Sequence, residues 1–218
     1  MIPIVPAIIP KSEEELKQSL VNLSFAEEIQ IDVVDGKFVP FVSWPYNPPG
    51  SPFLIRDEAA KCSVEIDLMV TNPIEAGQEW LEAGADMLVF HIESINLESF
   101  RAFVNTTSVS VGVSALNDTP LENLYPYAEI ADYVQLMGIA EIGAQGQSFD
   151  DRVLERIKVI KQKFPNHPIS IDGSVNQETI LLLKRAGANR FIAGSAIVGA
   201  SDPYTAYKNL VSLANQDK

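Results

Sequence analysis

Short apolar segments alternate with helical patterns along almost the whole of this 218-residue chain. Each segment is continuous enough in Val, Ile, Leu and Phe to be buried on both faces, as the strands of parallel sheets are. The segments are residues 3–9, 28–34, 63–69, 87–91, 109–114, 132–137, 168–172 and 190–194. Alternation of this kind indicates consecutive strand–helix units around a parallel sheet. Eight units predict an α/β fold of one type, the closed (β/α)8 TIM barrel.

The number of units favours this barrel over an open doubly wound sheet. Open sheets in chains of this length usually have about five or six strands and often a Gly-x-Gly-x-x-Gly turn after the first. This chain lacks that turn. Because 46% of its residues are apolar, the chain can bury one substantial core. We therefore expect a single domain over residues 1–218.

Helix boundaries in the sequence agree with the strand count. Ser12-Glu13-Glu14-Glu15 has capping-box spacing, and Asn72-Pro73 and Asp202-Pro203 each place a capping residue before a Pro suited to the first helical position. Gly84 and Gly187 occupy the same place in two similar segments, between a helical pattern and an apolar strand. These glycines predict helix ends that lead into strands.

The overall charge and the N-terminal sequence exclude several classes of partner. A net charge of −13 argues against nucleic acid and against an anionic membrane surface, both of which need clustered Lys and Arg. The lone cysteine, Cys62, cannot form an intrachain disulfide. The first residues lack the basic and apolar segments of a signal peptide, and no apolar run reaches the roughly 20 residues needed to span a bilayer. We expect a cytoplasmic protein.

Three aspartates lie at or near the ends of predicted strands, namely Asp32, Asp67 and Asp172. The carboxyl ends of barrel strands meet at the face where TIM-barrel enzymes hold their chemistry. Gln30 precedes Asp32 by two residues, so strand alternation points it to the same side, one layer deeper. An ionised carboxylate among apolar residues needs a partner, a cation or a proton. The structural alternative is that an isolated aspartate of this kind caps a helix or pairs with a lysine.

Electrostatic repulsion sharpens the prediction for the three aspartates. Two carboxylates about 5 Å apart repel by roughly 3 kcal/mol at an effective dielectric constant near 20, so three mutual pairs approach roughly 10 kcal/mol. We expect either a divalent cation among Gln30, Asp32, Asp67 and Asp172 or a strongly raised carboxyl pKa. Amide and carboxylate oxygens suit Mg²⁺ or Mn²⁺ better than Zn²⁺, which prefers His and Cys.

Small residues in the last three strand–helix loops form a second candidate site. The residues are Gly143, Gly146, Gly173, Ser174, Gly194 and Ser195. Backbone N–H groups at such turns can hold a phosphate without any basic side chain, and TIM barrels often bind phosphate in these loops. This would reconcile an anionic ligand with an acidic protein. The structural alternative is that each glycine only serves its own turn.

Other features have two interpretations each. His91 either faces the mouth of the barrel or is a structural histidine, and Met69 and Met137 either pack in the core or line a substrate pocket. The segment 35–52 contains five prolines together with Trp44 and one tyrosine. It is either a rigid surface loop or a wall over the barrel mouth.

Six motifs spread over most of the chain resemble those of one family. They are Ile31-Asp32-Val33-Val34-Asp35-Gly36-Lys37-Phe38-Val39-Pro40, Asp67-Leu68-Met69-Val70, Phe90-His91-Ile92-Glu93, Gly146-Gln147-Ser148-Phe149, Ile171-Asp172-Gly173-Ser174-Val175-Asn176 and Ala193-Gly194-Ser195-Ala196-Ile197. Together they resemble the ribulose-phosphate 3-epimerase family. The resemblance implies a ribulose-phosphate-binding TIM barrel, a phosphorylated ketose substrate and a homo-oligomer. It also implies that Asp32 and Asp172, on opposite faces of the substrate, exchange a proton at C3 through an enediolate.

The chain departs from the family pattern at several positions. The family usually has metal-binding histidines where this chain has Gln30 and Asp67. Pro10 stands where a substrate-contacting serine is usual, and Ser174 replaces a second glycine. The segment from Met137 to Gly146 also lacks the usual Asn-Pro-Gly-Phe-Gly-Gly motif.

Three hypotheses follow from these departures. In the first, Gln30, Asp32, Asp67 and Asp172 hold Mg²⁺ or Mn²⁺, and the protein interconverts ribulose 5-phosphate and xylulose 5-phosphate or a related ketose phosphate pair. In the second, no metal is bound, and one carboxyl stays protonated and donates a hydrogen bond to the enediolate. In the third, the barrel is catalytically inactive or repurposed and binds phosphosugars as a sensor or partner subunit.

Overall fold

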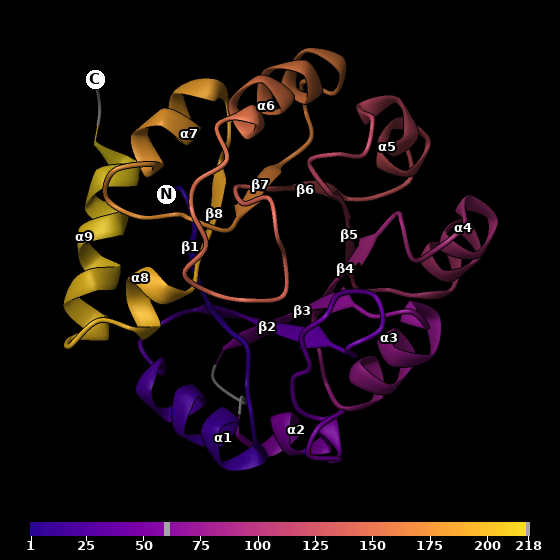
Figure 1. Ribbon diagram of the computed structural model, residues 1–218, viewed down its shortest axis with the longest axis vertical. Helices are drawn as coiled ribbons and strands as arrows, with labels where there is room; N and C mark the ends of the chain where they lie inside the picture. The colour runs from indigo at the N-terminus through magenta and orange to yellow at the C-terminus, as the bar shows by residue number, and fades with distance from the viewer. Residues whose placement is uncertain (59–61, 217–218) are drawn as a thin grey trace.

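A computed structural model describes residues 1–58 and 62–216 of the chain. Eight parallel strands follow one another around a closed barrel in sequence order, and the last strand pairs with the first. Figure 1 looks down this barrel and shows the helices as a ring around it. The predicted (β/α)8 TIM barrel is confirmed. No helix in the described parts of the chain is long and apolar enough to cross a lipid bilayer.

The observed strands match the predicted segments to within two residues at each end. The strands are β1 (Ile4–Ile8), β2 (Glu28–Val34), β3 (Ser63–Met69), β4 (Met87–His91), β5 (Ser110–Ala115), β6 (Tyr133–Met137), β7 (Ile169–Asp172) and β8 (Arg190–Ala193). The helices are α1 (Glu13–Asn22), η1 (Pro52–Leu54), α2 (Ile55–Glu58), α3 (Pro73–Glu82), α4 (Leu97–Thr106), α5 (Leu121–Ala128), α6 (Arg152–Lys163), α7 (Ile180–Ala186), α8 (Ser195–Val198) and α9 (Pro203–Asn215).

The predicted helix boundaries are found with one difference in detail. The Ser12 hydroxyl accepts from the backbone N–H of Glu15, and Asp202 caps α9 in the same way through Thr205. Asn72 is the N-cap residue of α3 but makes no capping hydrogen bond through its side chain. Gly84 and Gly187 follow helices α3 and α7 with φ values of +106° and +122°, a conformation in which a side chain would be strained.

Alternation along each strand separates an apolar outer layer from a polar interior. The outward side chains of β2, such as Ile29 and Ile31, belong to the main apolar core under the helices. Fully buried polar residues on β2 and on other strands point into the barrel. These residues include Gln30, Glu65, Asp67, His91, Ser114, Gln135 and Ser170. The barrel interior is therefore largely polar, and a small apolar cluster of Val5, Ala7 and Ile192 lies on β1 and β8.

An arginine pairs with two glutamates at the amino-terminal end of the barrel interior. Arg190 donates to Glu65 over 3.1 Å and to the Ser170 hydroxyl over 3.0 Å, and it also pairs with Glu28. The Tyr133 hydroxyl donates to Glu65 over 2.5 Å. The lack of a side chain at position 112 makes room for the Tyr133 ring, because a Cβ atom there would lie 2.3 Å from it. Arg190 therefore offsets part of the negative charge of the two glutamates at this end.

The proline-rich segment after β2 is fixed to the barrel rim. Trp44 is buried against Trp80, and its backbone N–H donates to the carbonyl of Pro10 over 2.8 Å. The Ser43 hydroxyl accepts from the Val34 backbone N–H at the end of β2. The Phe38 ring lies 5.5 Å from the His91 ring. The segment thus forms a wall on one side of the barrel mouth, the second of the two interpretations above.

Candidate active site

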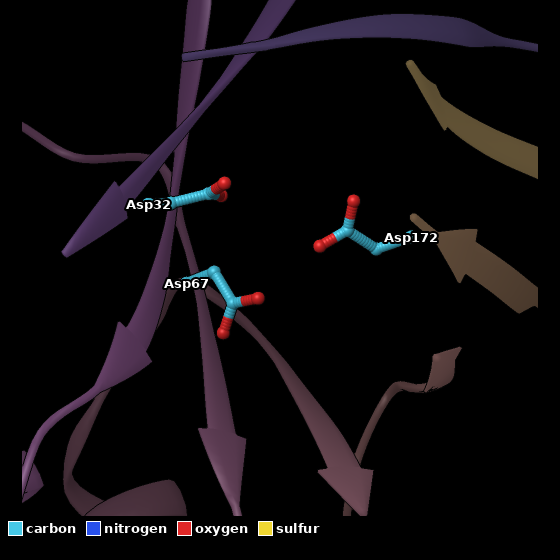
Figure 2. A group of neighbouring side chains, drawn as sticks. All are labelled: Asp32, Asp67 and Asp172. Carbon is cyan, nitrogen blue, oxygen red and sulfur yellow. The ribbon is translucent and has the colours of Figure 1, made fainter. Parts of the chain in front are cut away.

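Three aspartates converge inside the barrel, toward the carboxyl ends of its strands, namely Asp32, Asp67 and Asp172. Asp32 and Asp67 are register partners on β2 and β3, and Asp172 ends β7. Figure 2 shows their carboxylates pointing toward one another, with Asp172 facing the other two. One oxygen atom from each carboxylate lies within 4.8 Å of the other two, and all three residues are buried. This arrangement could hold a metal ion.

Gln30 lies among these carboxylates, as the alternation of β2 predicted. Its Nε2 atom donates to Oδ1 of Asp32 over 2.8 Å and to Oδ2 of Asp172 over 3.3 Å. Its Oε1 atom is buried and has no hydrogen-bond partner among the described residues. In this arrangement Gln30 serves the carboxylates as a donor. It would act as a metal ligand only through Oε1.

Burial and mutual repulsion change the acidity of two carboxyl groups. Burial raises the pKa of Asp32 well above its ordinary value, and the charges of Asp172 and Asp67 raise it further. Burial, followed by the charge of Asp67, raises the pKa of Asp172 to about 7. The cluster therefore favours holding a proton or a cation at neutral pH, as the electrostatic argument predicted.

Asp67 has two hydrogen-bond partners that the sequence did not assign to it. Oδ1 lies 2.9 Å from Nε2 of His91, and Oδ2 accepts from Nε2 of Gln135 over 2.9 Å. Burial would lower the pKa of His91, but the Asp67 carboxylate more than offsets this, and the pKa is raised. His91 thus lies inside the barrel and bonds to a site residue. Gln135 was not predicted, although its place two residues before Met137 points it inward.

The six small residues predicted to bind phosphate surround one cavity of about 320 Å³. They are Gly143, Gly146, Gly173, Ser174, Gly194 and Ser195, and Asp32 and Asp172 line the same cavity. Ser174 has a φ of +53°, a left-handed conformation that is uncommon for a residue with a side chain. No Lys or Arg is found among the described residues that line this cavity. The hydrogen-bond donors that these lining residues offer to an anionic group are therefore uncharged.

The loop between β6 and α6 covers part of this cavity and passes across the barrel in Figure 1. The Gln145 side chain donates to the carbonyl of Ala7 on β1 over 2.9 Å. The Ser174 hydroxyl donates to the carbonyl of Gln147 over 2.9 Å. Two side-chain hydrogen bonds therefore hold the loop against the neighbouring strand ends.

The methionines predicted as either core or pocket residues serve both purposes. Met69 and Met137 pack with Ile139 in a small apolar cluster above the barrel strands. All three residues also line the cavity. One wall of the site is therefore apolar.

Comparison with known solved structures supports the fold. A 3-keto-L-gulonate-6-phosphate decarboxylase from Vibrio cholerae superposes with a TM-score of 0.74 at 15% identity, covering 99% of this chain and 98% of that one. A 3-hexulose-6-phosphate synthase superposes with a TM-score of 0.69 at 21% identity, covering 96% of this chain and 98% of that one. At these identities the comparison shows the barrel fold alone.

Comparison of sequences identifies the family. The model of the ribulose-phosphate 3 epimerase family matches residues 3–198. The cytoplasmic isoform of ribulose-phosphate 3-epimerase from Oryza sativa subsp. japonica is 32% identical over 184 residues, which is 82% of this chain and 78% of the relative. The Aquifex aeolicus ribulose-phosphate 3-epimerase is 31% identical, covering 86% of this chain and 85% of the relative. The chain therefore belongs to the ribulose-phosphate 3-epimerase family of isomerases.

Proposed function

We propose that this enzyme interconverts ribulose 5-phosphate and xylulose 5-phosphate by moving a proton at C3. The observation that carries the proposal is the placement of Asp32 on β2 opposite Asp172 on β7, with the Gln30 carboxamide bonded to both. Two carboxyl groups on opposite sides of a substrate can remove a proton from one face and return one to the other. The relatives named as ribulose-phosphate 3-epimerases supply the substrate pair.

In each direction of the proposed reaction, one aspartate acts as the base and the other acts as the acid. The ionised carboxylate takes the C3 proton, which leaves an enediolate. The protonated carboxyl then gives its proton to C3 from the opposite face, which inverts the configuration. In the reverse direction the two groups exchange roles. The pKa of about 7 for Asp172 suits this work, because an acid–base catalyst is most effective when its pKa lies near the working pH.

We assign the phosphate of the substrate to the turns after β6, β7 and β8. The cavity joins these turns to Asp32 and Asp172, so one ligand can reach both ends. Backbone N–H groups of Gly173, Gly194 and Ser195 are the donors we expect to bind it. Uncharged backbone donors can bind the phosphate without any basic side chain, so the excess of acidic residues in the chain does not prevent binding.

The donor set of the cluster fits a divalent cation. Asp32, Asp67 and Asp172 would hold it through carboxylate oxygens, and Gln30 would join them through Oε1, which has no hydrogen-bond partner in the described parts of the chain. Oxygen ligands favour Mg²⁺ or Mn²⁺ over Zn²⁺. When bound, such an ion would stabilise the negative charge of the enediolate.

A mechanism without a metal also has support from one observation. Gln30 presents its amide nitrogen to Asp32 and Asp172, which already offsets part of their repulsion. Burial and the neighbouring carboxylates raise the pKa of Asp32, which favours its protonated form, and a protonated carboxyl can donate a hydrogen bond to the enediolate.

We further propose that the chain is a single domain that works in the cytoplasm. The two ends of the described chain meet, because Asn215 at the end of α9 bonds to the backbone of Ile2 before β1. One relative is named as a cytoplasmic isoform.

NMR of the metal-stripped protein with ribulose 5-phosphate in D₂O tests the proposed function. Deuterium at C3 and the appearance of xylulose 5-phosphate are the expected results. Exchange only after addition of Mg²⁺ or Mn²⁺ would support the metal site, and exchange without metal would support the protonated carboxyl. Absence of exchange with every metal tried, Zn²⁺ included, would refute epimerisation of this substrate.

A further inference from the structure

Gln135 takes no part in the reaction proposed above, yet it contacts one of the three carboxylates. It is fully buried on β6, and its Nε2 atom donates to Oδ2 of Asp67 on β3 over 2.9 Å. His91 on β4 holds the other oxygen of the same carboxylate over 2.9 Å. Asp67 is therefore bound from two directions by side chains of two other strands.

This support distinguishes Asp67 from the other two carboxylates. Within the part of the chain that the structure describes, Asp32 and Asp172 share a single side-chain donor, Gln30, whereas Asp67 has one side-chain donor on each oxygen. A carboxylate oxygen has two lone-pair directions. Each oxygen of Asp67 uses one direction on its donor and keeps one for another partner. The orientation of the carboxylate is thus set while its capacity to bind a cation is kept.

Both supporting side chains carry a further unpartnered atom. Oε1 of Gln135 and Nδ1 of His91 are buried and have no hydrogen-bond partner among the described residues. A leucine at position 135 would leave no buried amide oxygen to be unsatisfied. Each of the two residues therefore places a donor on Asp67 and leaves one buried polar atom unsatisfied, which costs stability.

We propose that Gln135 and His91 are positioning residues that orient the Asp67 carboxylate toward a divalent cation shared with Asp32 and Asp172. The inference rests on the metal site of the proposed function and extends it to two residues that do not ligate. Removing a partner that orients a ligand typically weakens metal binding about 10- to 100-fold. A purely structural role would lower the stability of the fold and leave the cation affinity of the folded protein unchanged.

Calorimetric titration of the metal-stripped full chain with Mn²⁺ tests the inference. Q135M and H91L each remove one donor, and Q135N shortens the carboxamide as a second variant at position 135. H91Q keeps a donor at position 91. S114A is the matched control, because Ser114 is fully buried beside His91 but donates to the Met137 sulfur and to no carboxylate. Circular dichroism at the titration temperature verifies that each variant is folded.

We expect the dissociation constant for Mn²⁺ to rise about 10- to 100-fold in Q135M and H91L, less in H91Q, and not at all in S114A. Equal affinity in the wild type and both donor-removing variants would refute the positioning role and leave the metal site standing. A loss in S114A as large as in Q135M would also refute it. A wild-type protein that binds no Mn²⁺ would refute the metal site and this inference together, even if the exchange experiment showed epimerisation.

Discussion

Asp32 and Asp67 are direct register partners on neighbouring parallel strands, and both side chains are buried inside the barrel. Two negative charges about 5 Å apart repel by roughly 3 kcal/mol at an effective dielectric constant near 20, and Asp172 adds further repulsion. The closed barrel keeps these groups together because their strands are fixed by pairing on both sides. Folding therefore maintains a concentration of negative charge, which the Gln30 amide offsets in part and which a proton or a cation would relieve further.

The stability of the metal-free protein should fall as the pH rises from 5.5 to 8. Folding raises the pKa of Asp172 from its ordinary value near 4 to about 7. A raised carboxyl pKa stabilises the fold fully at low pH, and this stabilisation is lost as the pH passes through the folded value. The whole difference corresponds to roughly 4 kcal/mol between pH 4 and pH 7, of which about half, roughly 2 kcal/mol, is lost between pH 5.5 and pH 8. The raised pKa values of Asp32 and His91 act in the same direction.

Thermal unfolding in the presence of EDTA at several pH values measures this effect. D172N should unfold at a temperature that depends less on pH than the wild type does. Wild-type stability that increases between pH 5.5 and pH 8 would contradict the expected charge repulsion.

Replacing either proposed proton carrier should abolish epimerisation. D32N and D172N each remove one acid–base group and keep the shape of the side chain, so we expect formation of xylulose 5-phosphate to fall by at least about 1,000-fold in both. Exchange of the C3 proton of ribulose 5-phosphate should be lost only in the variant that lacks the aspartate facing this proton. The variants should stay folded, because each removes a repelling charge. D118N is the control, since Asp118 is an exposed carboxylate paired with Arg152 outside the cavity. Formation of xylulose 5-phosphate within tenfold of the wild-type rate in either variant would rule out the role of that aspartate as a carrier.

Restoring two histidines should change the preferred metal. Q30H/D67H replaces two oxygen donors by imidazole nitrogens, which suit Zn²⁺ better than they suit Mg²⁺. Competitive titration should show that the affinity for Zn²⁺ relative to Mn²⁺ rises by at least about tenfold over wild type. Q30N, which keeps an amide, provides the comparison. An unchanged ratio would show that positions 30 and 67 do not select the metal.

The barrel was predictable because each of its strands is recognisable from local sequence alone. Buried parallel strands carry continuous apolar runs, and the loops at Gly84 and Gly187 separate them from helices. The three aspartates were predictable for a related reason. A carboxylate at the end of an apolar run stands out, and barrel topology brings all strand ends to one face.

The partners of those aspartates were not predictable, because they depend on contacts across the barrel. Gln135 is a neutral residue in an apolar strand, and its contact with Asp67 joins positions 68 residues apart. The Arg190–Glu65 pair spans 125 residues for the same reason. The sequence placed Gln30 on the correct side of β2, but only the hydrogen bonds show that its nitrogen faces the carboxylates.

A methyl group at position 194 should weaken substrate binding and leave the chemical step nearly intact. A Cβ atom at Gly194 would lie 2.6 Å from Nε2 of Gln145, whose bond to Ala7 holds the β6–α6 loop. The methyl group would also enter the part of the cavity assigned to the phosphate. We expect G194A to raise KM for ribulose 5-phosphate by about 10-fold or more while kcat changes by less than about threefold.

The double variant G194A/Q145A separates the two effects of that methyl group. Q145A removes the side chain that clashes together with its bond to Ala7, so Q145A alone is the reference, and on that background G194A should cost no further thermal stability. The high KM should persist, because the methyl group still lies where the phosphate binds. Recovery of KM together with stability would mean that Gly194 serves only to admit Gln145. An unchanged KM in G194A itself would show that the phosphate does not bind at the turn after β8, since the added carbon would then obstruct no ligand.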